Sequence, residues 1–436
     1  MIQKVAIVGA GPSGVLLAHY LLRRSEQYQV DLYDAKSDPR VIEFSKARTY
    51  PLILNERGIG ALGQIDGIEA AVRDASLEMR GGVFHQSGGK TRVTSRKKPM
   101  LTLARTKLVI TLLQKLTEKY DNSRLNLHFN RACTKVDFTT KTISFQTPTQ
   151  TSAPSDMNLT TNYDLLIGAD GARSAVRTAF LNTEMFEFEQ KYVPTDYKSF
   201  NLPCPTQQSK IHLQSDKIHS WRSNSNIVVL LVPQLDGSLS GTILFPRQNN
   251  QVASLATPEA VLQFFHTYFP EVGQLMSASA AEAFLQHPLS RVLTIRCNRY
   301  HHGDRVLILG DAAHAVSPSL GQGCNAALED VAIFDKLLDE YDDNWAEAIA
   351  RFTTRRKVDA HALLELSDYS SPSSPQLAIE FVLRERLAKT LHQLFPSYFA
   401  PSLIDMVFES TVPYAEILRS YKGWIAKVKS NQYSSE

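Results

Sequence analysis

Residues 4–14 read Lys-Val-Ala-Ile-Val-Gly-Ala-Gly-Pro-Ser-Gly, and the order of residue types in this stretch decides the fold of the first part of the chain. The apolar run Val5–Val8 predicts a short buried strand, and residues 15–22 predict a helix with an apolar stripe. Three glycines in the spacing Gly-x-Gly-x-x-Gly separate the strand from the helix. A strand, a glycine-rich turn and a helix in this order predict a βαβ unit that binds a dinucleotide.

Each glycine of this turn has its own task. Gly9 permits the tight turn, Gly11 lets the backbone approach a pyrophosphate, and Gly14 lets the helix pack closely on the strand. The next predicted strand, residues 29–33, leads into Asp34, where a carboxylate can accept hydrogen bonds from a ribose diol. A glycine-rich turn without a ligand is the alternative, but the complete order of strand, glycines, helix and acid favours a binding site. The residues expected to bind the dinucleotide here are Gly9, Gly11, Pro12, Ser13, Gly14 and Asp34.

A second glycine-rich run lies far downstream. Residues 310–325 read Gly-Asp-Ala-Ala-His-Ala-Val-Ser-Pro-Ser-Leu-Gly-Gln-Gly-Cys-Asn. They follow an apolar, strand-like stretch at Val306–Leu309 and lead into a helical pattern from about Asn325. Asp311 can hold a hydroxyl, and the glycines allow helix amides to reach a negative or carbonyl group. The run therefore predicts a second point of contact with a ligand.

The composition fits a large globular enzyme. At 436 residues, with 43% hydrophobic side chains, the chain can fill a large core, and a net charge of +3 gives no case for a nucleic-acid partner. No stretch approaches about eighteen uninterrupted apolar residues, and the N-terminus runs directly into the first strand, so we expect neither a membrane span nor a secretory signal. The scattered cysteines suit a reducing cytoplasm and argue against disulfides or a metal site; they are Cys133, Cys204, Cys297 and Cys324.

Strand and helix signals alternate up to about residue 180, and strand-like segments then dominate from 186 to 296. One amphipathic helix, at 258–268, interrupts this second region. We expect an α/β fold with a Rossmann-like domain, an inserted β-sheet domain for the substrate and a C-terminal helical region. The expected segments are 1–75, 101–182 and 299–368 for the Rossmann-like domain, 76–100 and 183–298 for the substrate domain, and 369–436 for the helical region.

The fingerprint at Gly9, the run Asp170-Gly171-x-x-Ser174-x-Val176-Arg177 and the run at 310–325 together resemble the single-component flavin-dependent aromatic hydroxylases. The resemblance covers nearly the whole chain and is greatest to the kynurenine 3-monooxygenases, through residues 79–85, 190–194, 264–270, 310–325 and 406–414. It implies a fold like that of p-hydroxybenzoate hydroxylase, FAD as the cofactor, NADPH or NADH as the transient reductant, and O2 and a small aromatic molecule as substrates.

The resemblance also implies where FAD lies. Asp34 would contact the adenosine ribose, Arg105 the pyrophosphate and Asp311 the ribityl chain. Asp170 would bind the flavin or the nicotinamide, although capping of a helix is an equal alternative. The remaining residues of the site would be Gly310 and, beside the isoalloxazine ring, Gly321, Gln322, Gly323, Cys324 and Asn325.

The implied reaction hydroxylates an aromatic or otherwise electron-rich molecule. A nicotinamide reduces the flavin, and oxygen then gives a flavin hydroperoxide that transfers hydroxyl to the substrate. Because the cofactor carries this chemistry, no catalytic residue is named. Hydroxylation of kynurenine itself, and a flavin-dependent reductase or dehydrogenase, are the alternatives.

Departures from the kynurenine enzymes lie on the substrate side. The family's carboxylate-binding arginine falls at Gly82, a tyrosine that helps it falls at Arg96, and an asparagine falls at Ser370. Either Arg80 or Arg96 could supply the missing positive charge. We expect the substrate near Arg80, Arg96, Pro318, Ser319, Leu320 and Tyr414. Helices expected at 377–394 and 406–428 would cover the substrate cavity rather than contact a membrane, in a monomer or homodimer.

Overall fold

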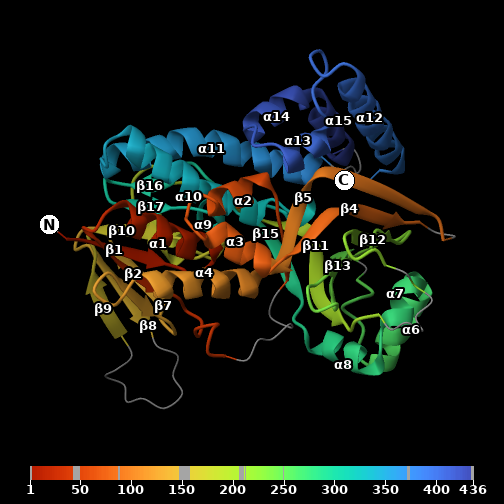
Figure 1. The fold of residues 1–436 in the computed structure, drawn as a ribbon, viewed down its shortest axis with the longest axis horizontal. Coiled ribbons are helices and arrows are strands. Elements are labelled where there is room, and N and C mark those ends of the chain that lie inside the picture. The colour runs from red at the N-terminus through yellow and green to blue at the C-terminus, as the bar shows by residue number, and fades with distance from the viewer. Residues whose placement is uncertain are drawn as a thin grey trace.

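The computed structural model describes residues 2–42, 50–86, 89–146, 158–205, 211, 213–248, 250–370 and 374–433. Its strands form a six-stranded, an eight-stranded and a three-stranded sheet. Figure 1 shows the six-stranded sheet near the N-terminus, the eight-stranded sheet at the other end of the molecule, and the C-terminal helices above the latter. This α/β arrangement, with a helical C-terminal region, agrees with the fold expected from the sequence.

The six-stranded sheet has the order β16-β17-β10-β1-β2-β6. All neighbours are parallel except β16 and β17. Val8 at the end of β1 pairs with Tyr33 of β2 and with Gly168 of β10, so the carboxyl ends of these strands meet at one edge. In parallel α/β sheets this edge is where ligands bind. The strands are β1 (Gln3–Val8), β2 (Tyr28–Tyr33), β6 (Leu125–His128), β10 (Leu165–Gly168), β16 (His301–His302) and β17 (Val306–Ile308).

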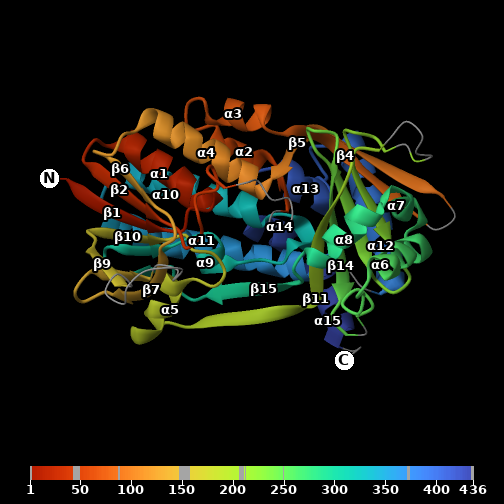
Figure 2. The ribbon, with the colours of Figure 1, turned by 90° about the horizontal axis from the view of Figure 1, so that it is seen from below.

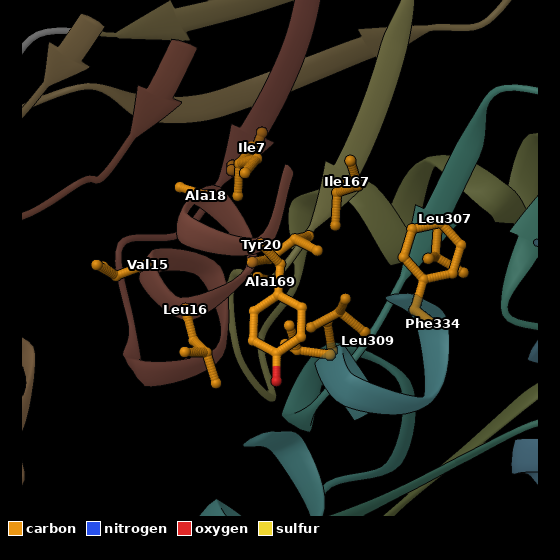
Figure 3. Close-up of a cluster of buried hydrophobic side chains, with 14 of the residues drawn as sticks. Ile7, Val15, Leu16, Ala18, Tyr20, Ile167, Ala169, Leu307, Leu309 and Phe334 are labelled. Atoms are coloured by element: carbon orange, nitrogen blue, oxygen red, sulfur yellow. The ribbon is translucent and has the colours of Figure 1, made fainter. Parts of the chain in front are cut away.

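Helices pack on this sheet through apolar faces. Figure 3 shows side chains from the strands and from the helices, among them Ile7, Leu16, Ile167, Leu307 and Phe334, meeting in one cluster. Each of these five side chains is buried, and burial of one such side chain contributes about 1.5–3 kcal/mol. The helices of this part are α1 (Pro12–Arg24), α2 (Glu56–Leu62), α3 (Ile68–Asp74), α4 (Arg105–Lys119), α5 (Ala175–Ala179), α9 (Asp311–His314), α10 (Gly323–Glu340) and α11 (Trp345–Tyr369), with the 3₁₀ turns η3 (Phe180–Asn182) and η4 (Pro318–Leu320).

The eight-stranded sheet combines two distant parts of the chain. Its order is β15-β11-β14-β13-β12-β4-β5-β3, and β12 joins the β4–β5 hairpin by parallel pairing of Ile218 with Gly82. Figure 2 shows the long strands of this sheet beside the C-terminal helices. Its strands are β3 (Pro51–Leu54), β4 (Leu77–His85), β5 (Thr91–Ala104), β11 (Phe188–Leu202), β12 (Ile218–Arg222), β13 (Val228–Pro233), β14 (Leu239–Pro246) and β15 (Ser290–Cys297). A small antiparallel sheet contains β7 (Ala132–Asp137), β8 (Thr142–Gln146) and β9 (Asn158–Asn162).

Three helices cover one side of the large sheet: α6 (Pro258–Tyr268), α7 (Pro270–Leu275) and α8 (Ala278–Gln286). The helix predicted at 258–268 is confirmed. We did not predict α7 and α8, because each is short and neither has enough turns to show a clear helical period. An aromatic cluster holds them to the sheet, with Phe200 of β11 lying 5.4 Å from Phe265 and 5.9 Å from Phe284 between ring centroids.

The C-terminal region contains α12 (Pro375–Leu394), α13 (Leu403–Glu409), α14 (Tyr414–Ser420) and α15 (Lys422–Tyr433). The single helix predicted at 406–428 is therefore wrong. The chain leaves helical geometry at Ser410, and Pro413 stands before the next helix. Proline lacks the backbone N–H and disfavours helical geometry in the residue before it, so apolar periodicity alone could not carry one helix through this point.

Candidate functional site

The fingerprint turn packs against the end of β10. Gly9 has a φ of +108°, and a Cβ placed on it would lie 2.3 Å from the Ala169 carbonyl oxygen. A Cβ on Gly14 would lie 2.0 Å from the Gly9 carbonyl oxygen. Both positions thus require glycine, for the turn and for the close contact of helix and strand. Gly11 caps α1, Pro12 is its first residue, and Ser13, the second, is buried.

Asp34 lies directly after β2 and faces the same turn. Its carboxylate accepts the Ala10 N–H at 2.9 Å and the Lys36 N–H at 2.8 Å, one on each oxygen. Each carboxylate oxygen can accept more than one hydrogen bond, so both oxygens retain capacity for hydroxyls of a ligand. The acid is therefore held in place beside the fingerprint without being saturated.

Arg105 links the fingerprint to the second glycine-rich run. It begins α4, and one of its terminal nitrogens lies 3.4 Å from where a Cβ on Gly11 would be. Tyr50 and, to a smaller extent, Asp311 raise the pKa of Arg105. The guanidinium therefore lies between the amino end of α1 and the start of α9. Such a position suits a pyrophosphate.

The side chains around Arg105 gather in one concave region beside the fingerprint turn, called the hollow below. Tyr50 is 38% exposed and Asp311 is also exposed, yet burial among protein atoms raises the pKa of Tyr50 to about 12 and also raises that of Asp311. Side chains that keep exposed surface and are still strongly desolvated by protein atoms lie in a concave part of the surface. Cys324 belongs to the same surroundings, because Arg105 and Asp311 both act on its thiol.

The run at 310–325 brings backbone to this hollow as well as the side chains of Asp311 and Cys324. Gly310 has φ 59° and ψ −142°, and Gly321 has φ 61° with open space where a Cβ would be. Gly323, Cys324 and Asn325 form the first turn of α10. The amides of a first helical turn lack acceptors within their own helix and attract negative charge.

The side chains of Gln322 and Asn325 are engaged within the protein. Gln322 Oε1 accepts hydrogen bonds from Asn55 Nδ2 and from the Tyr414 hydroxyl, each at 3.0 Å. Asn325 Oδ1 accepts the Asn55 N–H at 2.9 Å, and its amide donates to the Ile53 carbonyl at 2.9 Å. No pattern in the sequence distinguishes Asn55 from an ordinary cap of α2. In the structure it holds the loop that carries the α10 amides.

Asp170 caps a helix, which is one of the two roles that the sequence suggests for it; the other is binding of the flavin or the nicotinamide. Its Oδ2 accepts the Ala175 and Val176 N–H groups at 2.7 and 3.3 Å, while its buried Oδ1 has no partner among the described residues. Burial raises the pKa of this carboxyl. The capping role is therefore real, and one oxygen remains for a ligand.

A buried ionic network supports the Gly310 turn from behind. Asp330 on α10 is fully buried and accepts the Gly310 N–H at 2.7 Å and a hydrogen bond from His314 Nε2 at 2.6 Å. Arg356 of α11 donates to Asp330 at 2.5 Å and to Asp359 at 2.7 Å. The network thereby fixes the unusual backbone that turns Asp311 toward the hollow.

The same network reaches the C-terminal helices. Arg57 donates to Glu329 at 2.7 Å and to the Val412 carbonyl, and its guanidinium lies 4.0 Å from the ring centroid of Tyr414. The Ala415 N–H donates to Asp359 at 2.9 Å. Arginines and acids of this kind look like solvated surface residues in a sequence, so no local signal identifies them.

The residues expected near the substrate do not all meet. Arg80 is exposed and pairs with Glu78 at 3.0 Å, on the open face of β4. Arg96 instead reaches α13, where it lies 3.8 Å from the Glu409 carboxylate and 4.2 Å from the centroid of Phe408. Its side chain is only 16% exposed, and burial lowers its pKa.

The other expected substrate residues lie where η4 contacts the C-terminal region. Pro318 and Ser319 are exposed, and the Ser319 hydroxyl donates to the Ser367 carbonyl. Leu320 is buried in the core beneath the C-terminal helices, and Tyr414 is fully buried with its hydroxyl on Gln322. Tyr414 thus connects this region to the loop beside the hollow.

Three of the four thiols should be slow to react. Burial raises the pKa values of Cys133, Cys297 and Cys324 to about 12, whereas Cys204 is exposed. Only the thiolate reacts, so a short treatment with iodoacetamide at pH 8 is expected to label Cys204 and leave the other three unmodified. Peptide mass mapping would measure this. Labelling of Cys324 as fast as that of Cys204 would show that the hollow does not desolvate its thiol.

These residues fit FAD. The fingerprint and Arg105 suit the pyrophosphate, Asp34 suits a ribose diol, and the α10 amides suit the polar edge of a flavin ring. When bound, FAD would accept hydride from a nicotinamide and activate oxygen. Within the described parts of the chain, no group of three or more His, Cys, Asp or Glu residues is arranged to hold a metal ion, and no helix is long and apolar enough to cross a membrane.

Comparison with known proteins agrees with this geometry. Residues 3–367 match the model of the FAD binding domain family. Kynurenine 3-monooxygenase from Sus scrofa is 31% identical over 430 residues, which cover 97% of this chain and 87% of the relative. The enzyme of the same name from Drosophila willistoni is 32% identical over 428 residues, covering 96% and 90%.

Solved structures share the fold. The tetrameric form of 2-methyl-3-hydroxypyridine-5-carboxylic acid oxygenase superposes with a TM-score of 0.70 at 18% identity, covering 86% of this chain and 92% of that one. PqsL of P. aeruginosa, in complex with 2-aminobenzoylacetate, gives a TM-score of 0.67 at 17% identity, covering 88% and 100%. The chain belongs to the FAD binding domain family, and it is an FAD-dependent aromatic monooxygenase with a nicotinamide, NADPH or NADH, as its reductant.

Proposed function

We propose that this enzyme hydroxylates a small electron-rich aromatic molecule whose polar group is held by Arg96. The observation that carries the proposal is the place of Arg96, which extends from β5 to α13 beside Phe408 and Glu409 and is only 16% exposed. Arg80 is the weaker candidate, because it is exposed and already paired. Residues 76–100 and 183–298 are proposed as the substrate domain, and the substrate site would then lie between the eight-stranded sheet and the helical region from 369 onward.

The charge around Arg96 narrows the choice of substrate. Glu409 lies 3.8 Å away, so the pair is electrically neutral as a unit. A substrate with a lone carboxylate would have to compete with Glu409, whereas a neutral polar group or a zwitterion can engage both partners. We therefore expect neutral phenols, anilines or aromatic amino acids to be better substrates than simple aromatic acids.

Kynurenine is the second candidate substrate. The identity to kynurenine 3-monooxygenases along almost the full chain favours it, and its amino-acid group is a zwitterion. Gly82 counts against kynurenine as the substrate. The family resemblance implies an arginine at this position that binds the substrate carboxylate through two hydrogen bonds, and glycine has no side chain to do so. Gly82 pairs directly with Thr94 of β5, and Arg96 lies two residues beyond Thr94 on the same strand. Arg96 is therefore the arginine on this side of the hairpin that can replace the missing one.

A substrate screen tests the function. Purified enzyme with FAD is given NADPH and each aromatic candidate, and NADPH oxidation, oxygen uptake and product mass are followed together. We expect one candidate to stimulate NADPH oxidation and to gain one oxygen atom. NADPH oxidation with every candidate unmodified would instead indicate a reductase or oxidase. Fast conversion of kynurenine would identify the second candidate as the substrate.

Replacing Arg96 tests the anchor. Loss of a hydrogen bond to a charged group costs about 1.5–3 kcal/mol, so Arg96→Gln is expected to raise KM by about ten- to a hundredfold while changing kcat little. Arg80→Gln is the matched control, since it removes an exposed arginine of the same hairpin, and its KM should remain close to that of the wild type. Equal effects of the two substitutions would contradict a specific role for Arg96.

We propose the FAD contacts as a set: the fingerprint from Gly9 to Gly14, Asp34, Arg105, Asp170 through its free oxygen, Gly310, Asp311 and the backbone of 321–325. The ribose, pyrophosphate and ring would follow one another along the carboxyl edge of the parallel sheet. A monomer or homodimer is proposed for the assembly, and light scattering would distinguish them. The four free cysteines suit a reducing compartment such as the cytoplasm.

A further inference from the structure

Three buried amide side chains interlock where α2, α10 and the C-terminal helices meet. Asn55, Gln322 and Asn325 are each no more than 1% exposed. In both views of the molecule α2 lies between α10 and α13 (Figure 1 and Figure 2). The contact of α2 with α10 is close, because a Cβ on Gly58 would lie 2.5 Å from Asn325 Oδ1. The amides therefore sit in a tightly packed interface.

The hydrogen bonds of Asn55 fix the direction of its amide. Its Nδ2 donates one hydrogen to Gln322 Oε1 at 3.0 Å and the other to the Val407 carbonyl of α13 at 3.2 Å. Its Oδ1 accepts the Arg57 N–H at 3.1 Å and so caps α2. Two backbone groups set this orientation, since the Val407 carbonyl can only accept and the Arg57 N–H can only donate. Both hydrogens of the Asn55 amide are thus in use.

Asn55 thereby joins two distant segments. One is the flavin-edge segment, residues 321–325, whose amides are proposed to face the flavin ring. The other is the pair α13 and α14, which offers the Val407 carbonyl to Asn55 and the Tyr414 hydroxyl to Gln322 Oε1 at 3.0 Å. Movement of α13 or α14 away from α2 must break at least one of these bonds. Because the amides are buried, a broken bond would leave a polar group without a partner.

We propose that Asn55 is a positioning residue that couples the docking of α13 and α14 to the flavin-edge segment, and through it to the reduction potential of bound FAD. This role rests on the proposed contact of the segment with the flavin ring. With the helices docked, the amides at the start of α10 are held toward the polar edge of the ring, where they favour the negative charge of the reduced flavin. Undocking removes Tyr414 from Gln322 and Val407 from Asn55. The segment is then held less firmly, and reduction becomes less favourable.

Asn55→Ser tests the coupling with the helix cap left in place. Serine also accepts an N–H of the first helical turn, but it cannot make the two bonds of Asn55 Nδ2. We expect the preference of the protein for reduced over oxidised FAD to fall about tenfold, which lowers the potential of this two-electron couple by about 30 mV. Tyr414→Phe removes the donor on α14 and should shift the potential in the same direction. Anaerobic titration of the full-length, FAD-loaded enzyme against a reference dye measures it.

Hydrogen exchange, followed by mass spectrometry, reports on the coupling without relying on flavin chemistry. Both substitutions should speed the exchange of amides in 321–328, because the bonds that hold Gln322 are lost. Coupling between two equilibria acts equally in both directions. Reduction of the wild-type flavin with dithionite should therefore slow exchange in α13. A purely structural role of Asn55 predicts the same exchange in α13 with oxidised and with reduced flavin, and that result would overturn the proposal.

Asn344→Ser is the matched control. Asn344 caps α11 through the Glu347 N–H in the same way, but it is exposed and stands after the opposite end of α10. It should change neither the potential nor the exchange of 321–328, and an equal shift in this variant would show general loosening instead of coupling. Unchanged exchange of 321–328 in Asn55→Ser would overturn the coupling and leave the proposed FAD contacts intact. Faster exchange with an unchanged potential would overturn both, because the segment would then not face the flavin.

Discussion

Asp330→Ala is expected to lower the free energy of unfolding by about 3–5 kcal/mol and to weaken FAD binding. Breaking a buried ion pair by removing one partner costs about this much. Here Arg356, which is 2% exposed and donates to Asp330 at 2.5 Å, loses one of its three acids, and the Gly310 N–H and His314 Nε2 lose their acceptor. Arg356 keeps Asp359 and Glu329 as partners, but neither can replace the acceptor of the Gly310 N–H.

Urea unfolding in the presence of excess FAD would measure the stability, and quenching of flavin fluorescence would measure the affinity. Asp339→Ala is the matched control on the same helix. The Asp339 side chain is 69% exposed and pairs with Arg24, and exposed pairs contribute about 0–1 kcal/mol. If the two variants lost equal stability, the buried network would not hold the flavin loop.

The contribution of Asp330 should depend on pH in one direction. Burial acts to raise its pKa, but His314 and Arg356 outweigh it, so that the pKa of the folded carboxyl lies below its ordinary value. A depressed pKa in the folded state stabilises the protein above the unfolded pKa of about 3.9, and this stabilisation is lost as the pH falls through the folded value. The stability difference between wild type and Asp330→Asn should therefore shrink in acid. A difference that grew below pH 4 would contradict this assignment.

The sequence predicts the parts of the fold that local patterns determine. The strand before Gly9, the helix after it and the strand ending near Asp34 form one continuous unit, so composition and spacing suffice to predict them. The helix at 258–268 has a Thr cap, a proline at its start and a clear apolar period. By contrast, the break at Ser410–Pro413 was hidden because apolar residues on both sides continue the same period.

The buried network could not be predicted for a different physical reason. Arg57, Glu329 and Arg356 are far apart in the sequence, and each is of a type that is usually solvated. Only the packing of α2, α10 and α11 brings them together, with both guanidinium groups buried. The family resemblance drew attention to Gln322 and Asn325 but not to their binding of Asn55, because such contacts depend on tertiary structure. Charged residues gathered behind a loop are thus the part of a site that sequence patterns miss.

Gly9→Ala is expected to destabilise the protein by at least about 3 kcal/mol, because it combines a steric overlap with an unfavourable backbone conformation. The new Cβ would lie 2.3 Å from the Ala169 carbonyl oxygen and 2.8 Å from the Asp170 Cα, both rigid backbone atoms. At a φ of +108° the alanine would be strained even in open space. Relief of the overlap would move the end of β10 away from β1, and with it Asp170. FAD affinity should therefore fall together with stability.

Gly67→Ala separates the two causes. Gly67 also has a positive φ, of +74°, but a Cβ there would meet no atom within 4 Å. Gly67→Ala should therefore lower the free energy of unfolding only by the cost of the unfavourable backbone conformation, about 1–2 kcal/mol. FAD affinity should not change, because Gly67 caps α3 and lies outside the proposed FAD contacts. Thermal melting and FAD titration of both variants would measure the comparison. If Gly9→Ala lost no more stability than Gly67→Ala and bound FAD normally, the close approach of the fingerprint to β10 would not be what holds the cofactor edge together.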